Sequence, residues 1–483
     1  MDDRALAEPR LSRRLTVWSA VGVSLALMAP SMAININPQA SSAVTGRAVP
    51  IAFLLATVGV LLIAHTFVRL SQRFSHSGSV YAFVGMTLGP RSGAVAGWLT
   101  ACTYVLFGVV TSTAAGMFLT DLARKVLAPS ALPDWLPFPL AWSVLLAMWL
   151  LSTRDVRGGT TVLLITEGLT VLLILVVAVV TLARLITGAG GAHLDLSVFR
   201  IAPGTSASNL FLGVVFGFLS FAGFEAAATL GEETADPRRD IPRAILGTAV
   251  LGGVFFVALT AIAMMAFGTD AAGVAAFTNS QALIGDLAQR YVAGWVADLI
   301  IVGAAFSAAA CCLASLVGAS RLIFALSRDG LGPNGFASVH PIRAVPHVAA
   351  TVCAVSVAVI QAIGWVLLHA KPFDVFTIAG AAGTLVLLVA YAMACLGAVR
   401  LFLSSEPGAV RRWEVVIPVL GLLMLVYTVF RNVIPWPVGM SQWGPGLAIA
   451  VLAAVVTAAI ARPAAAQAAG AKLLTQSGLP PKG

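Results

Sequence analysis

The chain has 483 residues, of which 59% are hydrophobic and 10% are charged. A soluble globular protein carries about a quarter charged residues, so this composition excludes an ordinary soluble enzyme, and the apolar content excludes a disordered chain. The formal charge is +9, yet Lys and Arg are scattered over short loops and form no basic face, so we expect no nucleic-acid partner. Twelve apolar helices of about 20 residues would use roughly half of the chain. We therefore expect an all-α polytopic membrane protein in contact with the lipid bilayer.

Apolar runs with only isolated charges predict twelve transmembrane helices. The first run is 20 residues long, which favours a retained span over a cleaved signal peptide. The predicted spans are Leu15–Ile34, Val49–Val68, Ala94–Leu119, Ala131–Leu151, Thr161–Ala183, Leu210–Leu230, Ala244–Phe267, Val292–Leu322, Val348–Leu368, Phe376–Val399, Val415–Phe430 and Gly444–Ile460.

The segments outside these runs are too short for a soluble domain. We expect a cytoplasmic N-terminal tail over residues 1–14, one transmembrane domain over residues 15–462, and a disordered cytoplasmic tail over residues 463–483. The longest polar stretches, Arg69–Arg91 and Ser327–Pro346, are expected to be connecting loops. With the N-terminus in the cytoplasm, 21 of the 29 Lys and Arg residues fall on the cytoplasmic side. The positive-inside rule thus predicts a multi-pass protein of the cell membrane with both termini in the cytoplasm.

Only three carboxylates lie clearly within the apolar runs, where an ionisable group costs at least a few kcal/mol and marks a functional candidate. Asp298 lies near the predicted outer end of its run, and we interpret it as a solvated helix end. Glu167 and Glu225 lie in the inner halves of the fifth and sixth runs. Each is either a structural carboxylate or a group that gates transport, takes up a proton or attracts a cation.

Two runs carry signs of an interruption. Pro30 lies inside the first run, and Gly223 lies between Phe221 and Phe224 in the sixth. An interrupted helix presents a positive N-terminus that binds carboxylates and free carbonyls that bind ammonium or sodium, whereas a plain proline kink is the alternative. Because the two runs are five spans apart, equivalent helices face opposite ways, as in the inverted repeats of secondary transporters.

Other chemistry is not indicated. The five cysteines lie in apolar stretches without metal-ligand spacing, and the six histidines fall at span ends or in loops. No GxxxxGK[ST] motif is present. We expect neither an enzyme nor a cofactor or metal site.

Five segments carry a resemblance to a known family. They are Phe74–Tyr81 with Gly89–Arg91 and Gly97–Trp98, Phe221–Glu225 followed by Gly231–Thr234, Asp236–Ala244, Ser320–Arg321 leading to Ser327–Pro333, and His340–Pro341 before Val345–His347. Their order and spacing resemble the amino acid–polyamine–organocation (APC) permease superfamily over nearly the full chain. The resemblance implies twelve transmembrane helices, with a 5+5 inverted repeat formed by spans 1–5 and 6–10, broken helices 1 and 6, and two peripheral helices.

The resemblance also implies a substrate site between the two broken spans. The backbone at Ala29, Pro30, Ser31 and Met32 would meet the carboxylate of an amino acid, and carbonyls near Ser220, Phe221 and Ala222 would meet its ammonium group. Gly223 and Phe224 complete the implied substrate site. Phe221 and Phe224 are candidate aromatic gates, and Tyr104 either lines the pocket or packs in the core. The glycine-rich turn of many relatives is replaced here by Ala29-Pro30-Ser31, and proline has no N–H to donate.

Some proton-coupled relatives have a lysine in span 5, close to the position of Glu167 here, so the resemblance leaves the coupling ion open between H⁺ and Na⁺. The leading hypothesis is a secondary active transporter that moves an amino acid or related amine by alternating access, as a proton-coupled symporter or an exchanger. A neutral or apolar amino acid is favoured over a polyamine. The alternatives are a polyamine importer of the same fold and a transport-inactive sensor or channel.

Overall fold

The computed structural model describes residues 17–74, 79–127, 132–153, 157–188, 193–201, 206–227, 236–340, 345–404 and 412–461. All regular elements in these ranges are helices. The Gly231–Thr234 motif and both predicted tails lie outside the described residues.

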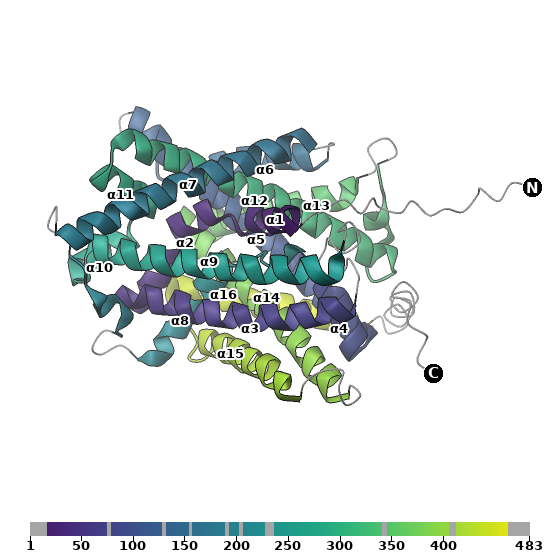
Figure 1. Ribbon diagram of the computed structural model, residues 1–483. Coiled ribbons are helices and arrows are strands. Elements are labelled where there is room, and N and C mark those ends of the chain that lie inside the picture. Colours follow the sequence, from purple (N-terminus) through teal and green to yellow (C-terminus); the bar gives the residue numbers. More distant parts are fainter. Residues whose placement is uncertain are drawn as a thin grey trace, which may run out of the picture.

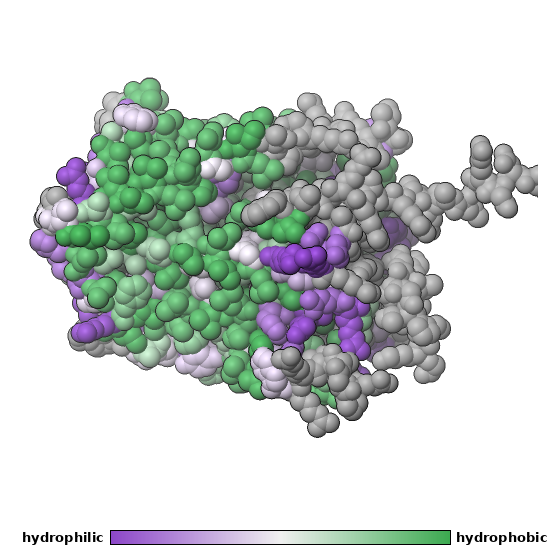
Figure 2. Space-filling model, viewed as in Figure 1, coloured by the Kyte–Doolittle hydropathy of each residue, from purple (hydrophilic) through white to green (hydrophobic). Residues whose placement is uncertain are grey.

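Nine helical segments in the described part of the chain are long and apolar enough to cross a membrane. Figure 1 shows the long helices side by side in a bundle, and Figure 2 shows a hydrophobic band across the visible face with hydrophilic side chains toward its ends. The nine segments contain α3 (Val49–Arg73), α5 (Pro90–Val126), α7 (Arg157–Thr187), α9 (Pro237–Phe267), α12 (Gly294–Arg328), α13 (His347–Ala362), α14 (Pro372–Ser404), α15 (Val416–Val433) and α16 (Trp443–Ala461). The chain is therefore a multi-pass membrane protein.

The bundle has a central and a peripheral part. In α5 and α12, 72% of the apolar window is buried within the protein, against 28% for the segment that contains α15 and 22% for the one that contains α16. On α7, the side chains of Leu169 and Val179 are 63% and 68% exposed, as expected for a face that meets lipid tails. The centre of the bundle is thus built from α5, α12 and the elements between them.

The first apolar run forms two helices, α1 (Val17–Met28) and α2 (Pro30–Thr45). Ala29 between them has φ 45° and ψ 58°, a left-handed conformation that costs a non-glycine residue about 1 kcal/mol. Pro30 is the first residue of α2, where its missing N–H and fixed φ are tolerated. The break therefore lies where the sequence predicts it.

The sixth run is also interrupted. Helix α8 (Leu210–Ser220) ends halfway along the run, and residues 221–227 form turns in which Phe221, Ala222 and Phe224 donate to carbonyls three residues back. Gly223 has φ +99°, a conformation that side-chain-bearing residues rarely adopt. The described part of this run thus stops being regular helix at Phe221.

Three features differ from the sequence expectations. Helix α2 continues to Thr45, beyond the expected end at Ile34, because its polar residues pack against protein and not against lipid. Helix α4 (Ser79–Leu88) lies inside Arg69–Arg91, which we expected to be a loop, and its Ala82, Phe83 and Val84 are buried. Helix α6 (Pro137–Ser152) is shorter than the predicted span Ala131–Leu151. The short helices α10 (Ala271–Thr278) and α11 (Leu283–Tyr291) lie outside the predicted spans, at the end of the bundle opposite α4 (Figure 1).

Candidate functional site

The two interrupted segments are joined by hydrogen bonds on both sides of their breaks. On the α1 side, Ser24 Oγ donates to the Phe224 carbonyl at 3.2 Å and accepts from the Ala227 amide at 3.0 Å. On the α2 side, Asn37 Nδ2 donates to Ser220 Oγ at 2.7 Å. These bonds place the two breaks next to each other in the centre of the bundle.

The N-terminus of α2 is capped by side chains from two other helices. The Ser31 amide donates to Glu167 Oε1 of α7 at 2.9 Å, and the Met32 amide donates to Ser307 Oγ of α12 at 3.2 Å. Glu167 is only 8% exposed and Ser307 is 3% exposed. Because the N-terminus of a helix carries a partial positive charge, it stabilises the ionised form of a carboxylate placed there. Glu167 thus lies against the start of the broken helix.

This capping leaves backbone carbonyls of α1 without their usual helical partners. In an uninterrupted helix, the amides of Ser31 and Met32 would donate to the carbonyls of Leu27 and Met28. Here the Leu27 carbonyl accepts instead from the Cys311 thiol of α12, at 3.1 Å. A weak thiol donor is easily displaced by a stronger one, so the end of α1 offers acceptors that suit an ammonium group.

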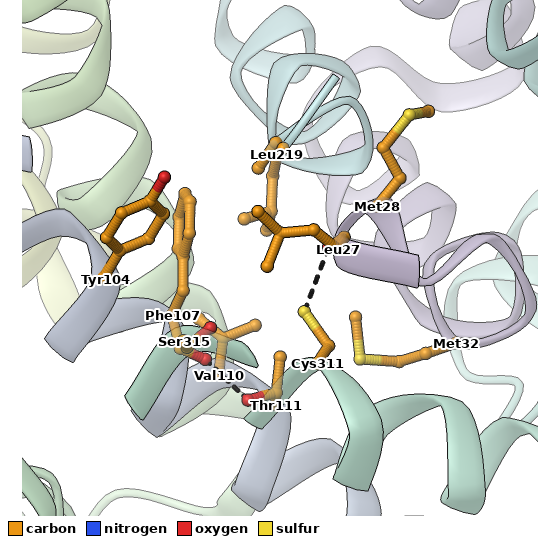
Figure 3. Close-up of a pocket in the computed structure, with 12 residues that line it drawn as sticks. Leu27, Met28, Met32, Tyr104, Phe107, Val110, Thr111, Leu219, Cys311 and Ser315 are labelled. Carbon is orange, nitrogen blue, oxygen red and sulfur yellow. Dashed lines mark hydrogen bonds between the residues drawn. The ribbon is translucent and has the colours of Figure 1, made fainter. Parts of the chain in front are cut away.

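A small pocket lies beside the breaks (Figure 3). In the figure, Leu27 and Met28 approach from α1 on one side, and Tyr104 and Phe107 from α5 on the other. Most of the lining is apolar, with a few hydroxyl groups and one thiol, as is usual in sites for small organic ligands. The lining residues are Leu27, Met28, Met32, Tyr104, Phe107, Val110, Thr111, Leu219, Ala222, Gly223, Cys311 and Ser315.

Four of the predicted substrate-site residues line this pocket, namely Met32, Tyr104, Ala222 and Gly223. Ala29, Pro30 and Ser31 form the break itself and are fully buried. Ser220 lies at the end of α8, where its hydroxyl donates to the Phe216 carbonyl and accepts from Asn37. The backbone predicted to bind substrate is thus assembled in one place, although the amides of Ser31 and Met32 are already engaged.

The two candidate gates pack into aromatic clusters. The Phe221 ring lies 5.4 Å from that of Phe256 on α9. The Phe224 ring lies 6.2 Å from Phe67 and 5.9 Å from Tyr391. Both rings are only 1% exposed, so a gating movement of either one has to disrupt these contacts. Their role as gates stays a prediction.

Glu225 follows Phe224 and is 3% exposed, with no hydrogen-bond partner among the described residues for its Oε2 atom. It lies beside the phenol groups of Tyr391 and Tyr104, and Tyr104 lines the pocket. Asp298 is in a different environment, because its side chain is 51% exposed and pairs with Lys125 at 2.8 Å. This agrees with a solvated helix end for Asp298 and leaves Glu167 and Glu225 as the buried acidic pair.

Sequence reasoning missed most of the pocket wall. Thr111 and Ser315 are polar residues within apolar helices, which is a weak signal, and Cys311 is one of the five cysteines in apolar stretches, which gave no sign of a site. Leu27, Phe107, Val110 and Leu219 carry no signal, because an apolar residue in a span gives no indication of whether it faces lipid, core or cavity. Among the described residues, no cluster of three or more His, Cys, Asp or Glu could hold a metal ion.

Comparisons with known proteins fit this geometry. A model of the amino acid permease family matches residues 23–466. The chain belongs to this family. The resemblance inferred from the sequence is thereby confirmed, and so is the expectation of a transporter rather than an enzyme.

Individual relatives have different cargoes. The chain is 26% identical to the low-affinity putrescine importer of Escherichia coli (strain K12), over 68% of this chain and 70% of the relative. It is 25% identical to the branched-chain amino acid permease of Bacillus subtilis (strain 168), over 63% and 65% of the two chains. It is 31% identical to the uncharacterized transporter Rv1999c of Mycobacterium tuberculosis (strain ATCC 25618 / H37Rv), over 89% and 88%.

The fold is also similar to that of a solved transporter. The crystal structure of a manganese transporter mutant from Eremococcus coleocola superposes with a TM-score of 0.57 at 13% identity, covering 97% of this chain and 100% of the other. At this identity the similarity establishes the fold alone. The permease chain therefore has the LeuT-like transporter fold.

Proposed function

We propose that this permease is a secondary active transporter that moves an amino acid or a related amine across the cytoplasmic membrane by alternating access. The observation that carries the proposal is the meeting of two interrupted helices at a small, largely apolar pocket, with the buried carboxylates Glu167 and Glu225 close by. Half-helix ends supply charge recognition inside a membrane without charged side chains in the pocket. The family and its putrescine and branched-chain amino acid relatives support this class of cargo.

In this proposal the cargo lies with its apolar part against Met28, Met32 and Leu219, and with its ammonium group toward the carbonyls at the end of α1 and after α8. Tyr104 and Thr111 supply hydroxyl groups on the facing wall. We further propose that the twelve apolar runs form twelve spans, with an inverted repeat of spans 1–5 and 6–10 and with both termini in the cytoplasm.

Glu167 is the proposed coupling residue. When ionised, it binds the N-terminus of α2 and holds α2 against α7. A proton on Glu167 removes the negative charge and weakens this attraction, so proton uptake favours a different position of α2. The same carboxylate could bind Na⁺, and the choice of ion is open to experiment.

The test is uptake of labelled amino acids and amines into proteoliposomes under an inward proton gradient, an inward sodium gradient, or neither. Accumulation driven by one gradient, as the proposal expects, identifies both cargo and coupling. Movement only when the lumen holds unlabelled cargo indicates an exchanger. Failure to move any cargo under all conditions contradicts the proposal and favours a sensor or channel.

One observation favours a second candidate, an importer of amines that lack a carboxylate. The Ser31 and Met32 amides, which would otherwise bind a cargo carboxylate, are occupied by Glu167 and Ser307. Two buried carboxylates with no cationic side chain in the pocket also favour a positively charged cargo. The putrescine importer among the relatives transports a cargo of this kind.

A further inference from the structure

Helix α2, which begins directly after the break, has an unusually polar sequence for a membrane protein. Its polar side chains are buried within the protein. Asn35, Gln39 and Ser42 are at most 2% exposed. Their spacing of four and three residues places them on one face of the helix. That face contacts α10, α11 and the connection between them, a unit that we call the α10–α11 hairpin.

Each of the three side chains hydrogen-bonds this hairpin. Asn35 Oδ1 accepts from the amides of Ile284 at 2.9 Å and Gly285 at 3.3 Å. Gln39 Nε2 donates to the Ser280 carbonyl at 3.4 Å, and the hydroxyls of Ser42 and Thr278 are 2.8 Å apart.

Asn35 is the most important of the three, because it replaces a missing helix cap. The residue before α11 is Ala282, which has no side-chain oxygen to accept from the free amides of the first turn. Asn35 supplies that acceptor from another helix, and it is fully buried. Loss of a buried cap leaves amides unsatisfied, which is costly where water is excluded.

The side-chain nitrogen of Asn35 hydrogen-bonds a residue next to the break. Asn35 Nδ2 donates to the Ser31 carbonyl at 2.8 Å, and the Ser31 amide donates to Glu167 Oε1. A continuous hydrogen-bonded path therefore runs from Glu167 through Ser31 and Asn35 to the first turn of α11. Such a path carries coupling only if its members have two arrangements, and a broken helix that moves in transport provides them.

We propose that Asn35 is the positioning residue that holds the α10–α11 hairpin closed over α2 and links this closure to the contact between Ser31 and Glu167. The assignment rests on the proposed transport function for the link to Glu167, but not for the closure itself. When α2 moves, Asn35 withdraws the cap from α11, so the hairpin and the break change position together.

The native Cys311 reports a movement of α2, since it lines the pocket at the break and donates to the Leu27 carbonyl next to that break. We would measure how fast a membrane-impermeant methanethiosulfonate, added to the outside of right-side-out vesicles without cargo, modifies Cys311. Cys311→Ser gives the background from the other cysteines. The expected result is that Asn35→Ala raises the rate about tenfold, because the closed state loses a buried cap.

Thr45→Val is the matched control, because Thr45 is a buried polar residue of the same helix whose hydroxyl, among the described residues, bonds only within α2, to the Ser41 carbonyl. Its labelling rate should equal that of wild type. An unchanged rate in Asn35→Ala, or an equal rise in Thr45→Val, would overturn the proposal.

Asn35→Asp tests the contact of Asn35 with α11 separately from its contact with Ser31. It also provides a second variant if Asn35→Ala does not fold. Aspartate keeps an oxygen for the α11 amides but has no N–H for the Ser31 carbonyl. We expect wild-type labelling of Cys311 together with a loss of gradient-driven accumulation. Normal accumulation would refute the link to Glu167. Because labelling needs no cargo, failure to find a cargo contradicts the proposed function without affecting the test of closure.

Discussion

The amide of Ser31 donates a hydrogen bond to Glu167 at 2.9 Å, although the two residues are 136 positions apart in the chain. This contact places a carboxylate from α7 on the positive end of α2, directly after the break. The orientation of α2 is thus set partly by a group whose charge depends on whether it carries a proton.

Glu167→Gln should separate coupling from transport. Glutamine keeps a side-chain oxygen that accepts from Ser31, so folding and the break should persist, but it cannot bind and release a proton. We expect exchange of labelled for unlabelled cargo to stay within about threefold of wild type, while gradient-driven accumulation falls at least about tenfold. Paired counterflow and proton-driven uptake assays on the same proteoliposomes measure both. Accumulation at the wild-type level would exclude Glu167 as the coupling site.

Glu225→Gln should impair transport more than Asp298→Asn. Glu225 is buried beside the pocket, whereas Asp298 is half exposed and makes a surface ion pair of the kind worth at most about 1 kcal/mol. We expect the initial rate of uptake to fall about tenfold or more for Glu225→Gln and less than about twofold for Asp298→Asn. Equal rates in both variants would contradict the assignment.

Gly223→Ala should distort the pocket. A Cβ atom at this position would lie 2.6 Å from Cγ of Leu27, and φ of +99° is strained for alanine. Because Leu27 lines the pocket, we expect weaker cargo binding together with a loss of about 1–2 kcal/mol in stability. Gly247→Ala is the control, because among the described residues no atom beyond its own helix backbone lies within 4 Å of its Cβ position. Thermal unfolding with and without cargo distinguishes the two variants, and similar behaviour would contradict the pocket assignment.

Leucine and its decarboxylated counterpart 3-methylbutylamine form a matched pair that tests the occupied amides of α2. Because Ser31 and Met32 already donate to Glu167 and Ser307, removal of the cargo carboxylate leaves few buried donors unsatisfied. We expect the amine to compete for uptake within about tenfold of the amino acid. If it competes about a thousandfold less well, the cargo carboxylate has dedicated donors and displaces Glu167 or Ser307.

Asp195 should make stability depend on pH at the loop before α8. Hydrogen bonds from the Thr269 hydroxyl and from the amide and hydroxyl of Ser197 lower the pKa of its carboxyl group. A lowered pKa means that the stabilisation is present above about pH 4, the usual pKa of Asp, and disappears as the pH falls through the lower folded-state value. Asp195→Asn should therefore lower the melting temperature slightly at pH 7 and have less effect near pH 3. A difference that does not depend on pH would refute this explanation.

The sequence was sufficient to place a helix in each of the twelve apolar runs and to locate the first break. Each of the twelve apolar runs contains a described helix, because about 20 apolar residues have no other stable arrangement in lipid. Pro30 marks the break because a residue without an N–H cannot continue the hydrogen bonding of a helix.

The partners across helices could not be predicted from the sequence. Asn35 and Gln39 lie beyond the predicted end of the first span at Ile34, and only their contacts with the α10–α11 hairpin explain why they are buried. The contact between Glu167 and Ser31 likewise depends on how α7 and α2 are placed, which periodicity along a single chain does not specify.

The break between α1 and α2 has an energetic consequence for the cargo. Pro30 has no N–H to continue the hydrogen bonding of a helix, whatever the pocket holds, and Ala29 before it has the left-handed conformation. A cargo molecule therefore spends none of its binding free energy on unwinding a helix, and that part of the cost is met when the protein folds. This preorganisation allows a small molecule with only one or two polar groups to bind usefully in a site that offers few hydrogen bonds.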